Sequence, residues 1–545
     1  MSMANAPTAP LLTANQEAAP AKEASIDDVI EMYFGATGVL QLLKAVLVAF
    51  AWAFDAQLVF ISAFTDAEPR WHCLTAASAG NASCSPAAAA SRPPCDLAPG
   101  SWAWDRLAVA SVVSEWTLNC AGPALVSLPA SSFFAGCLAG GFLLATLADS
   151  LLGRKKMLLV SLASTSIAGV LTALAPNIWA YAALRLVSGF FRSMVGTCTL
   201  VLSTELVGKR WRNTVSVAGF FCFAVGFLSL PALAYAFRDA SWRNLYVWTS
   251  VPCLCYAVLV FFLVQESPRW LLVRGRKQDA MEALRQIMSL NGGSTAGLSF
   301  SMLDACVVRE DNAAASGGGG VFAALRAMSA RRWALRRLAA VMATSFGVGM
   351  VYLGMPLNVG SLGSNLYLSV AYNALAELPS AVLAWLLIRR ASRRSSVIAL
   401  TAAAGACSLA CAAVPRGAAA ARMAAEVLSF FAACTAFDVM LVYATELFPT
   451  SVRNSAVGMV RQALVLGGVA APVLAALGRE RSAWSFGVFG VAIGCSGLFV
   501  ACLPETRGKS MSDTMAEEEE EGNEGAVASC TGATAGSTDS DRYAV

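Results

Sequence analysis

Five charged side chains stand inside long apolar stretches of this sequence, where an ion in a membrane is costly and usually functional. They are Asp55, Arg192, Glu377, Asp438 and Arg461. At 1.5 Å per helical residue, the last two each lie about 12 Å from the charged end of their stretch. Three acids and two bases leave one carboxylate unmatched, which suits an ammonium group or a coupling proton. We therefore predict that all five line a substrate-binding site.

Asp438 and Arg461 also have a simpler interpretation, in which they pair with each other and only stabilise the packing of helices. A pair that opens would present both charges to a zwitterion, so this interpretation does not exclude a functional role. Aromatic rings are the usual partners of ammonium groups. Tyr352, Tyr443 and Phe430 are therefore further candidates for the substrate-binding site.

The composition argues against several other kinds of chemistry. The chain has a single histidine, which argues against a zinc enzyme or a His-containing catalytic triad. No nucleophile and base stand in a recognisable catalytic arrangement. The net charge of +4 indicates no polyanionic partner such as nucleic acid. We expect no enzymatic activity, no cofactor and no metal.

The elements that position these charges are apolar helices. Hydrophobic residues make up 57% of the 545 residues and charged residues 14%, whereas a soluble domain has about 25% charged residues. About twelve apolar stretches of roughly 20 residues are each long enough to cross a bilayer. The sequence therefore predicts an all-α membrane protein with twelve transmembrane helices.

The two halves of the chain repeat the same charged marks at nearly the same offset. A Glu and an Arg seven residues apart recur after 241 positions, and two further marks recur after 239. Such a repeat predicts two six-helix halves related by an axis along the membrane normal, with a substrate cavity between them. The marks are Glu205 with Arg212 and Glu446 with Arg453, then Glu266 and Glu505, and Arg154 and Arg393.

We predict that these charges act in gating, because ion pairs at helix ends cost little whether they are paired or hydrated. The alternative is that the basic residues only determine the topology. The predicted gating residues are Asp149, Arg154, Glu205, Arg212, Glu266, Arg269, Glu446, Arg453, Glu505 and Arg507.

The distribution of basic residues predicts the orientation of the chain. The basic loops fall on one side, so the positive-inside rule places both termini in the cytoplasm and residues 65–126 outside. We expect a disordered cytoplasmic segment 1–41, a first bundle 42–264, a cytoplasmic linker 265–337, a second bundle 338–503 and an acidic cytoplasmic tail 504–545.

The predicted outer loop carries four cysteines, Cys73, Cys84, Cys95 and Cys120. In an oxidising compartment they would form two disulfides, and three pairings are possible. Asn81 begins an Asn-Ala-Ser triplet and is a candidate for glycosylation.

Several motifs resemble those of the major facilitator superfamily. Residues 266–271 (ESPRWL) and 504–508 (PETRG) resemble its sugar porters and its organic-ion transporters. The cysteine-containing outer loop, the Ser-Glu-Trp at 114–116 and the sequence ELFPTSVRN at 446–454 resemble the organic cation/carnitine transporter family, and above all its plant members. The resemblance implies alternating-access transport of organic cations and carnitine-like zwitterions, either facilitated or coupled to protons or sodium.

The sequence also departs from the family pattern. Val465 stands where the animal cation transporters carry an aspartate, so their rule for cation selection does not transfer. One alternative is a proton-coupled sugar transporter, although the predicted fifth, seventh and eighth spans contain no Gln. A second alternative is a non-transporting sensor on the same scaffold. The protein is expected in the plasma membrane or the vacuolar membrane.

Overall fold

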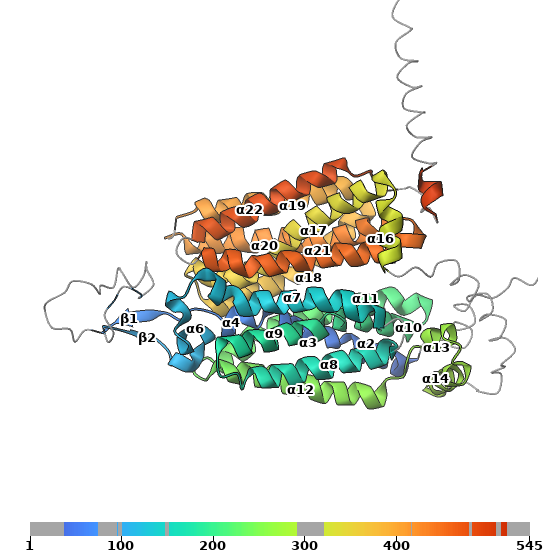
Figure 1. The fold of residues 1–545 in the computed structure, drawn as a ribbon, viewed down its shortest axis with the longest axis horizontal. Coiled ribbons are helices and arrows are strands. Elements are labelled where there is room, and N and C mark those ends of the chain that lie inside the picture. The colour runs from blue at the N-terminus through green and yellow to red at the C-terminus, as the bar shows by residue number, and fades with distance from the viewer. Residues whose placement is uncertain are drawn as a thin grey trace, which may run out of the picture.

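The computed structural model describes residues 38–74, 95, 97, 101–147, 152–290, 321–415, 417–478, 482–507 and 514–519. Within these residues, twelve helices are long and apolar enough to cross a membrane. Figure 1 shows them in two bundles that lie side by side, the first drawn in blue to green and the second in yellow to red. The expected fold, twelve membrane-spanning helices in two bundles, is confirmed.

The first bundle contains six spans, and two of them are interrupted helices. The first span is α2 (Val39–Ala49), α3 (Ala51–Phe60) and α4 (Ser62–Thr65), and the fourth is α9 (Ile178–Arg192) and α10 (Val195–Glu205). The other four are α7 (Pro123–Leu147), α8 (Arg154–Thr172), α11 (Lys209–Ala236) and α12 (Trp242–Leu263).

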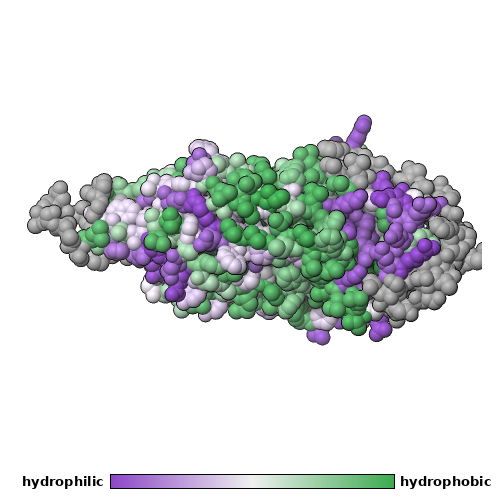
Figure 2. Space-filling view, turned by 90° about the horizontal axis from the view of Figure 1, so that it is seen from below, coloured by the Kyte–Doolittle hydropathy of each residue, from purple (hydrophilic) through white to green (hydrophobic). Residues whose placement is uncertain are grey.

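The second bundle also contains six spans. Its spans are α17 (Arg332–Asn358) with η6 (Val359–Leu362), α18 (Leu366–Arg390), α19 (Arg393–Ala413), α20 (Ala419–Glu446), α21 (Thr450–Leu477), and α22 (Ser482–Leu498) with η7 (Phe499–Cys502). Helices α7 and α21 pack against each other across the two halves, as do α11 and α18. A broad hydrophobic band lies between two hydrophilic ends, as a membrane protein requires (Figure 2).

Both ends carry short additional elements. At one end lie β1 (Trp71–Cys73), β2 (Trp102–Trp104), η2 (Ala108–Ala110), α6 (Val112–Glu115) and η3 (Leu118–Cys120). At the other end lie α13 (Pro268–Val273), α14 (Lys277–Leu290) and α16 (Val321–Ser329). We call the end that bears the basic loops cytoplasmic and the opposite end outer, following the positive-inside rule.

Disulfide bonds crosslink the segment between the first and second spans at the outer end. Strands β1 and β2 form an antiparallel hairpin in which His72 lies opposite Ala103. Cys95 and Cys120 form a disulfide, and Cys73 is also disulfide-bonded. Of the three pairings open to the sequence, the structure therefore contains one that includes the bond between Cys95 and Cys120. Cys84 and the candidate glycosylation site Asn81 lie outside the described residues.

Glycines allow two helices of the first bundle to approach closely. A Cβ added at Gly136 of α7 would lie 2.0 Å from the backbone oxygen of Leu186, and one at Gly189 of α9 would lie 1.9 Å from that of Phe133. Small residues permit such close backbone contact between membrane helices. This contact holds α9, which carries Arg192, tightly against α7.

Candidate substrate site

In the first bundle, the two membrane charges form a closed ion pair. The Nε and Nη2 atoms of Arg192 donate to the two carboxylate oxygens of Asp55, at 2.8 and 2.7 Å. Asp55 is only 1% exposed, while the Arg192 side chain is 18% exposed. A bidentate pair of this kind is both strong and strictly oriented. The pair joins α3 to α9 and neutralises both charges.

Arg461 reaches across from the second bundle toward this pair. Its Nη1 atom donates to Thr197 Oγ1 of α10 at 3.5 Å, and its charge interacts with those of Arg192 and Asp55. Because Arg192 is already paired with Asp55, Arg461 adds an uncompensated positive charge to the interface between the halves. Such a charge is suited to an anionic group of a substrate.

In the second bundle, the two acids have no basic partner among the described residues. Glu377 of α18 accepts a hydrogen bond from Tyr352 at 2.9 Å, and its Oε2 atom is buried with no hydrogen-bond partner within the described chain. Asp438 of α20 interacts electrostatically with both Glu377 and Tyr352. Two carboxylates that share one site and lack a nearby base favour binding of a cation.

Aromatic rings surround these two acids. The Tyr352 ring is stacked with Phe430 at 5.7 Å and with Phe437 at 5.6 Å between centroids. Phe60 from the first bundle meets the edge of Tyr352 at 6.4 Å, and Phe227 meets Phe430 at 6.4 Å. Rings beside carboxylates provide the environment that ammonium groups prefer, and here the rings come from both halves.

The charged marks at the cytoplasmic ends fold in the same way in the two halves. Glu266 accepts from the backbone N–H groups of Lys155 at 2.8 Å and Lys156 at 3.4 Å, at the start of α8. Glu505 accepts from those of Arg393 at 2.9 Å and Arg394 at 3.2 Å, at the start of α19. A carboxylate at a helix N-terminus satisfies unpaired donors and suits the helix dipole.

The second bundle adds contacts around a further carboxylate, that of Glu446. Arg393 pairs with Glu446 at 3.2 Å, and Thr506 donates to the same carboxylate at 2.6 Å. Arg507 donates to the backbone oxygen of Arg390 at 2.7 Å. Burial alone would raise the pKa of Glu505, but hydrogen bonds from Ser392 and from backbone N–H groups lower it.

The chain is similar in sequence to known membrane transporters. The family model described as "Sugar (and other) transporter" matches residues 112–516. Organic cation/carnitine transporter 2 of Arabidopsis thaliana is 49% identical over 522 residues, which cover 94% of this chain and 97% of that protein. Organic cation/carnitine transporter 3 of the same plant is 48% identical, with 91% and 93% covered.

This chain belongs to the organic cation/carnitine transporter family. A more distant relative, solute carrier family 22 member 3 of Rattus norvegicus, is 30% identical over 81% of this chain and 78% of its own length. The organic cation/carnitine transporters belong to the major facilitator superfamily, so this family member is a multi-pass membrane transporter and not an enzyme.

Solved structures support the same fold for this transporter. The xylose transporter XylE from E. coli, in a partially occluded inward-open conformation, aligns with a TM-score of 0.60. The alignment covers 87% of this chain and 99% of that one at 16% identity. At that identity the likeness concerns the fold alone. The sugar-transporter alternative is therefore weaker than the organic-cation assignment.

The alternative interpretation, in which Asp438 and Arg461 pair with each other, does not hold in this structure, where no ion pair or hydrogen bond joins them. The two residues do lie on consecutive helices, but α21 packs against α7 and α17, whereas α20 packs mainly against α18 and α19. Arg461 consequently contacts Thr197 in the other half, while Asp438 lies close enough to Glu377 for their charges to interact. Equal depth along two helices did not determine which way their side chains point.

Tyr443 also lies away from the predicted substrate site. Its hydroxyl donates to the backbone oxygen of Pro504 at 2.5 Å, and its ring is fully buried in the cytoplasmic part of the second bundle. It fastens the chain after the last span to α20. Tyr443 therefore stabilises the packing of the second bundle in this transporter.

The predicted gating charges that have assigned partners contact residues of their own half. Glu266 contacts α8, Glu446 and Glu505 contact the start of α19, and Arg453 donates to the backbone oxygen of Phe448 at 3.2 Å. These contacts are made within each half and do not bridge the halves. Glu205 ends α10, and its Oε2 atom is buried without a hydrogen-bond partner in the described chain.

The other predicted gating residues are Arg154, Arg212, Arg269 and Asp149. Arg154, Arg212 and Arg269 also have interaction partners, and Asp149 lies outside the described residues. A role of these charges in gating stays a prediction.

The sequence analysis missed one buried acid of the second bundle. Glu426 of α20 is 0% exposed and accepts from Asn373 of α18 at 2.9 Å. The signal was the same as for the five charges considered, a carboxylate inside an apolar stretch. Glu426 was overlooked because it lies in the outer part of α20, only seven residues from the helix start.

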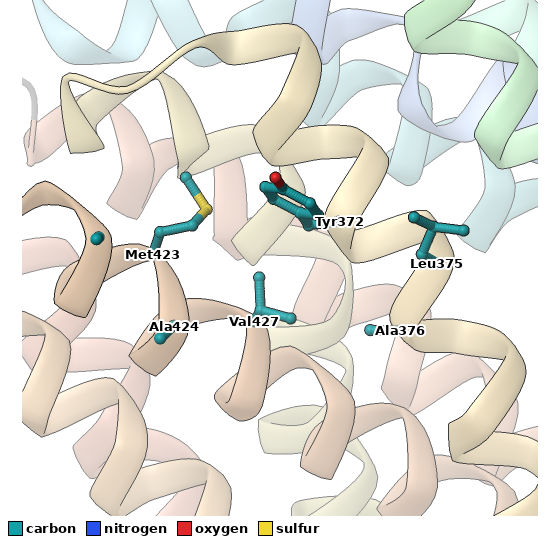
Figure 3. Close-up of a pocket in the computed structure, with 7 residues that line it drawn as sticks. Tyr372, Leu375, Ala376, Met423, Ala424 and Val427 are labelled. Carbon is teal, nitrogen blue, oxygen red and sulfur yellow. The ribbon is translucent and has the colours of Figure 1, made fainter.

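A groove of about 560 Å³ lies between α18 and α20. Figure 3 shows Tyr372 and Met423 facing each other across it. No charged residue lines it, so it is distinct from the site of Glu377 and Asp438. The groove is lined by Tyr372, Leu375, Ala376, Ala420, Met423, Ala424 and Val427.

Proposed function

We propose that this transporter carries organic cations and carnitine-like zwitterions across the membrane by alternating access. The observation that carries this proposal is the pair of carboxylates, Glu377 and Asp438, without a basic partner in the described chain. The stacked rings of Tyr352, Phe430 and Phe437 lie beside them. The names of the Arabidopsis relatives, organic cation/carnitine transporters, agree with this chemistry.

The same arrangement accommodates a zwitterion. An ammonium group would lie between the acids and the rings of the second bundle. The carboxylate of a carnitine-like substrate would then turn toward Arg461, whose charge is not neutralised by the pair of Asp55 and Arg192. A simple amine would use only the acidic side, which explains how one site serves both substrate classes.

We propose that the pair of Asp55 and Arg192 is where a coupling ion, either a proton or sodium, acts. Asp55 is buried, and both of its carboxylate oxygens are held by Arg192. A coupling ion that competes with Arg192 for this carboxylate would leave two arginine charges, Arg192 and Arg461, beside the cavity. Substrate affinity and binding of the coupling ion would thereby become linked.

Uptake into proteoliposomes tests the substrate class. Labelled carnitine, choline, a polyamine and a hexose are compared for wild type, Glu377→Gln and Asp438→Asn. The matched control is Glu426→Gln, a buried acid on the same helix as Asp438 that contacts Asn373 instead. We expect wild-type uptake of the cations and the zwitterion, loss in the two site variants and retention in the control. Uptake of hexose alone would contradict the proposal.

A further inference from the structure

A polar cluster at the outer end of the first bundle has no part in the substrate site. Asp66 directly follows α4, and its Oδ1 atom accepts from the hydroxyl of Tyr181 at 2.7 Å and from that of Thr65 at 3.1 Å. The hydroxyl of Tyr181 also lies 2.8 Å from that of Tyr246. These residues come from the first, fourth and sixth spans, so the cluster ties three helices together.

The cluster contains polar atoms that have no partner. Asp66 Oδ2 and the Nε and Nη1 atoms of Arg185 are buried, and none has a hydrogen bond within the described residues. The remaining Nη2 atom of Arg185 donates to Ser62 at 3.0 Å, and the guanidinium lies 4.1 Å from the ring centre of Phe133. Unpaired buried groups are rare and costly. The Asp66 carboxylate and the Arg185 guanidinium therefore each have hydrogen-bonding capacity that no described residue uses.

The charged and titratable groups that face Asp66 are few. Tyr181 and Arg185 approach it from α9, and Tyr246 interacts with it from α12. The next ion pair, Glu115 with Arg243, lies beyond Trp242. Burial raises the pKa of Asp66 above its ordinary range, although the hydrogen bond from Tyr181 and the charge of Arg185 oppose the shift. Burial thus makes this carboxyl group easier to protonate here than in water.

The residues next to Asp66 close the outer end of the molecule. Phe64, two positions earlier, stacks on Tyr367 of α18 with ring centres 5.7 Å apart. Arg106 donates to the Tyr367 hydroxyl at 2.6 Å, and Arg70 donates to the backbone oxygen of Gly363 at 3.2 Å. All three contacts join the first half to the second at the outer end. Opening that end requires the segment around Asp66 to move.

We propose that Asp66 is a proton-binding site through which external acid holds the outer end of this transporter closed. In the closed form, burial of the Asp66 carboxyl group favours its protonated form. In the open form, water reaches the carboxylate, which then ionises and releases its proton. The ligand is a proton, and its site is separate from Asp55 and from the substrate.

The sign of the effect follows from linkage. The closed form binds the proton more tightly than the open form, so a fall in external pH favours closure and a rise favours opening. Each unit by which the pKa of Asp66 differs between the two forms changes the ratio of closed to open molecules about tenfold. This inference rests on alternating access from the proposed function, but not on the nature of the substrate.

Hydrogen–deuterium exchange of the full chain in proteoliposomes without substrate tests the proposal. Exchange of peptides spanning 60–74 and 359–370 is followed between pH 5 and 8, with exchange times scaled for the intrinsic effect of pH. In wild type we expect about tenfold greater protection at the acid end for each unit of pKa difference. Asp66→Asn, which is neutral at every pH, should stay protected throughout.

Two further variants keep the test decisive if Asp66→Asn folds poorly. Tyr181→Phe removes the hydrogen bond that favours the carboxylate, so its transition should move to higher pH. Asp239→Asn, an exposed acid at the same end, should behave as wild type. A wild-type response in both Asp66→Asn and Tyr181→Phe, or no response in wild type, would overturn the proposal. Failure of the substrate proposal would instead appear only in the uptake assay.

Discussion

The two bundles hold the acids in the middle of their spans in opposite ways. In the first bundle, Asp55 is held by a bidentate pair with Arg192. In the second bundle, Glu377 and Asp438 interact electrostatically with each other, and neither pairs with a base among the described residues. One half therefore offers a neutral ion pair, and the other offers negative charge that can bind a cation.

At the cytoplasmic ends, by contrast, the two halves make the same contacts. Glu266 and Glu505 each cap the helix after a short basic loop, with matching backbone hydrogen bonds. The residues repeated in the two halves thus make the same contacts at the cytoplasmic ends, where they stabilise the fold. The halves differ where the charges lie in the membrane, which suggests that the differences serve transport.

The largest expected effect breaks the pair in the first bundle. Arg192→Gln leaves the Asp55 charge buried and unpaired, which should destabilise the protein by about 3–5 kcal/mol and abolish uptake. The double variant Asp55→Asn with Arg192→Gln removes both charges and should regain most of the stability. Thermal unfolding of the purified proteins measures both. Equal unfolding temperatures for the single and double variants would contradict the account.

A smaller effect is expected at the two helix caps. Glu505→Gln should lower stability by about 1 kcal/mol, as does loss of a helix cap in general, and Glu266→Gln should do the same. The lowered pKa of Glu505 means that its contribution is present above the ordinary range of a glutamate. The contribution disappears as the pH falls through the lowered value. Unfolding temperatures from pH 7 to pH 3 would show this, and an effect confined to one half would argue against equivalent caps.

The smallest expected effect concerns the hydroxyl beside the acids of the second bundle. Tyr352→Phe removes one hydrogen bond to Glu377, worth about 1 kcal/mol, and keeps the ring. The KM for a cation should change by only a few fold, because the ring contacts with Phe430 and Phe437 remain. Tyr352→Leu should raise it further. If both substitutions had the same effect, the ring would contribute nothing to cation binding.

Much of the fold was predictable from the sequence, because apolar length and basic loops depend on composition and order alone. The offset between Glu266 and Glu505 predicted equivalent positions, and the structure places both at helix N-termini. The partners of Asp438 and Arg461 were not predictable in this way. They depend on the rotation of α20 and α21 about their axes, which is determined by contacts with α7, α17 and α18.

The membrane charges show the same limit. Their presence near the middle of the spans followed from counting residues, but the pair of Asp55 with Arg192 joins helices far apart in the chain. The sequence also gave no reason to separate Tyr443, which fastens Pro504, from Tyr352, which faces the acids. Both are tyrosines in apolar stretches, and only packing distinguishes them.

The most direct test of the account is binding of labelled choline to the purified transporter. We predict that the wild-type protein binds choline and that the double variant Glu377→Gln with Asp438→Asn weakens binding by at least about 100-fold, the loss of two charge contacts of roughly 1.4 kcal/mol each. The variant Glu426→Gln should bind as wild type does. Unchanged affinity in the double variant would contradict the claim that the acids of the second bundle bind the cation.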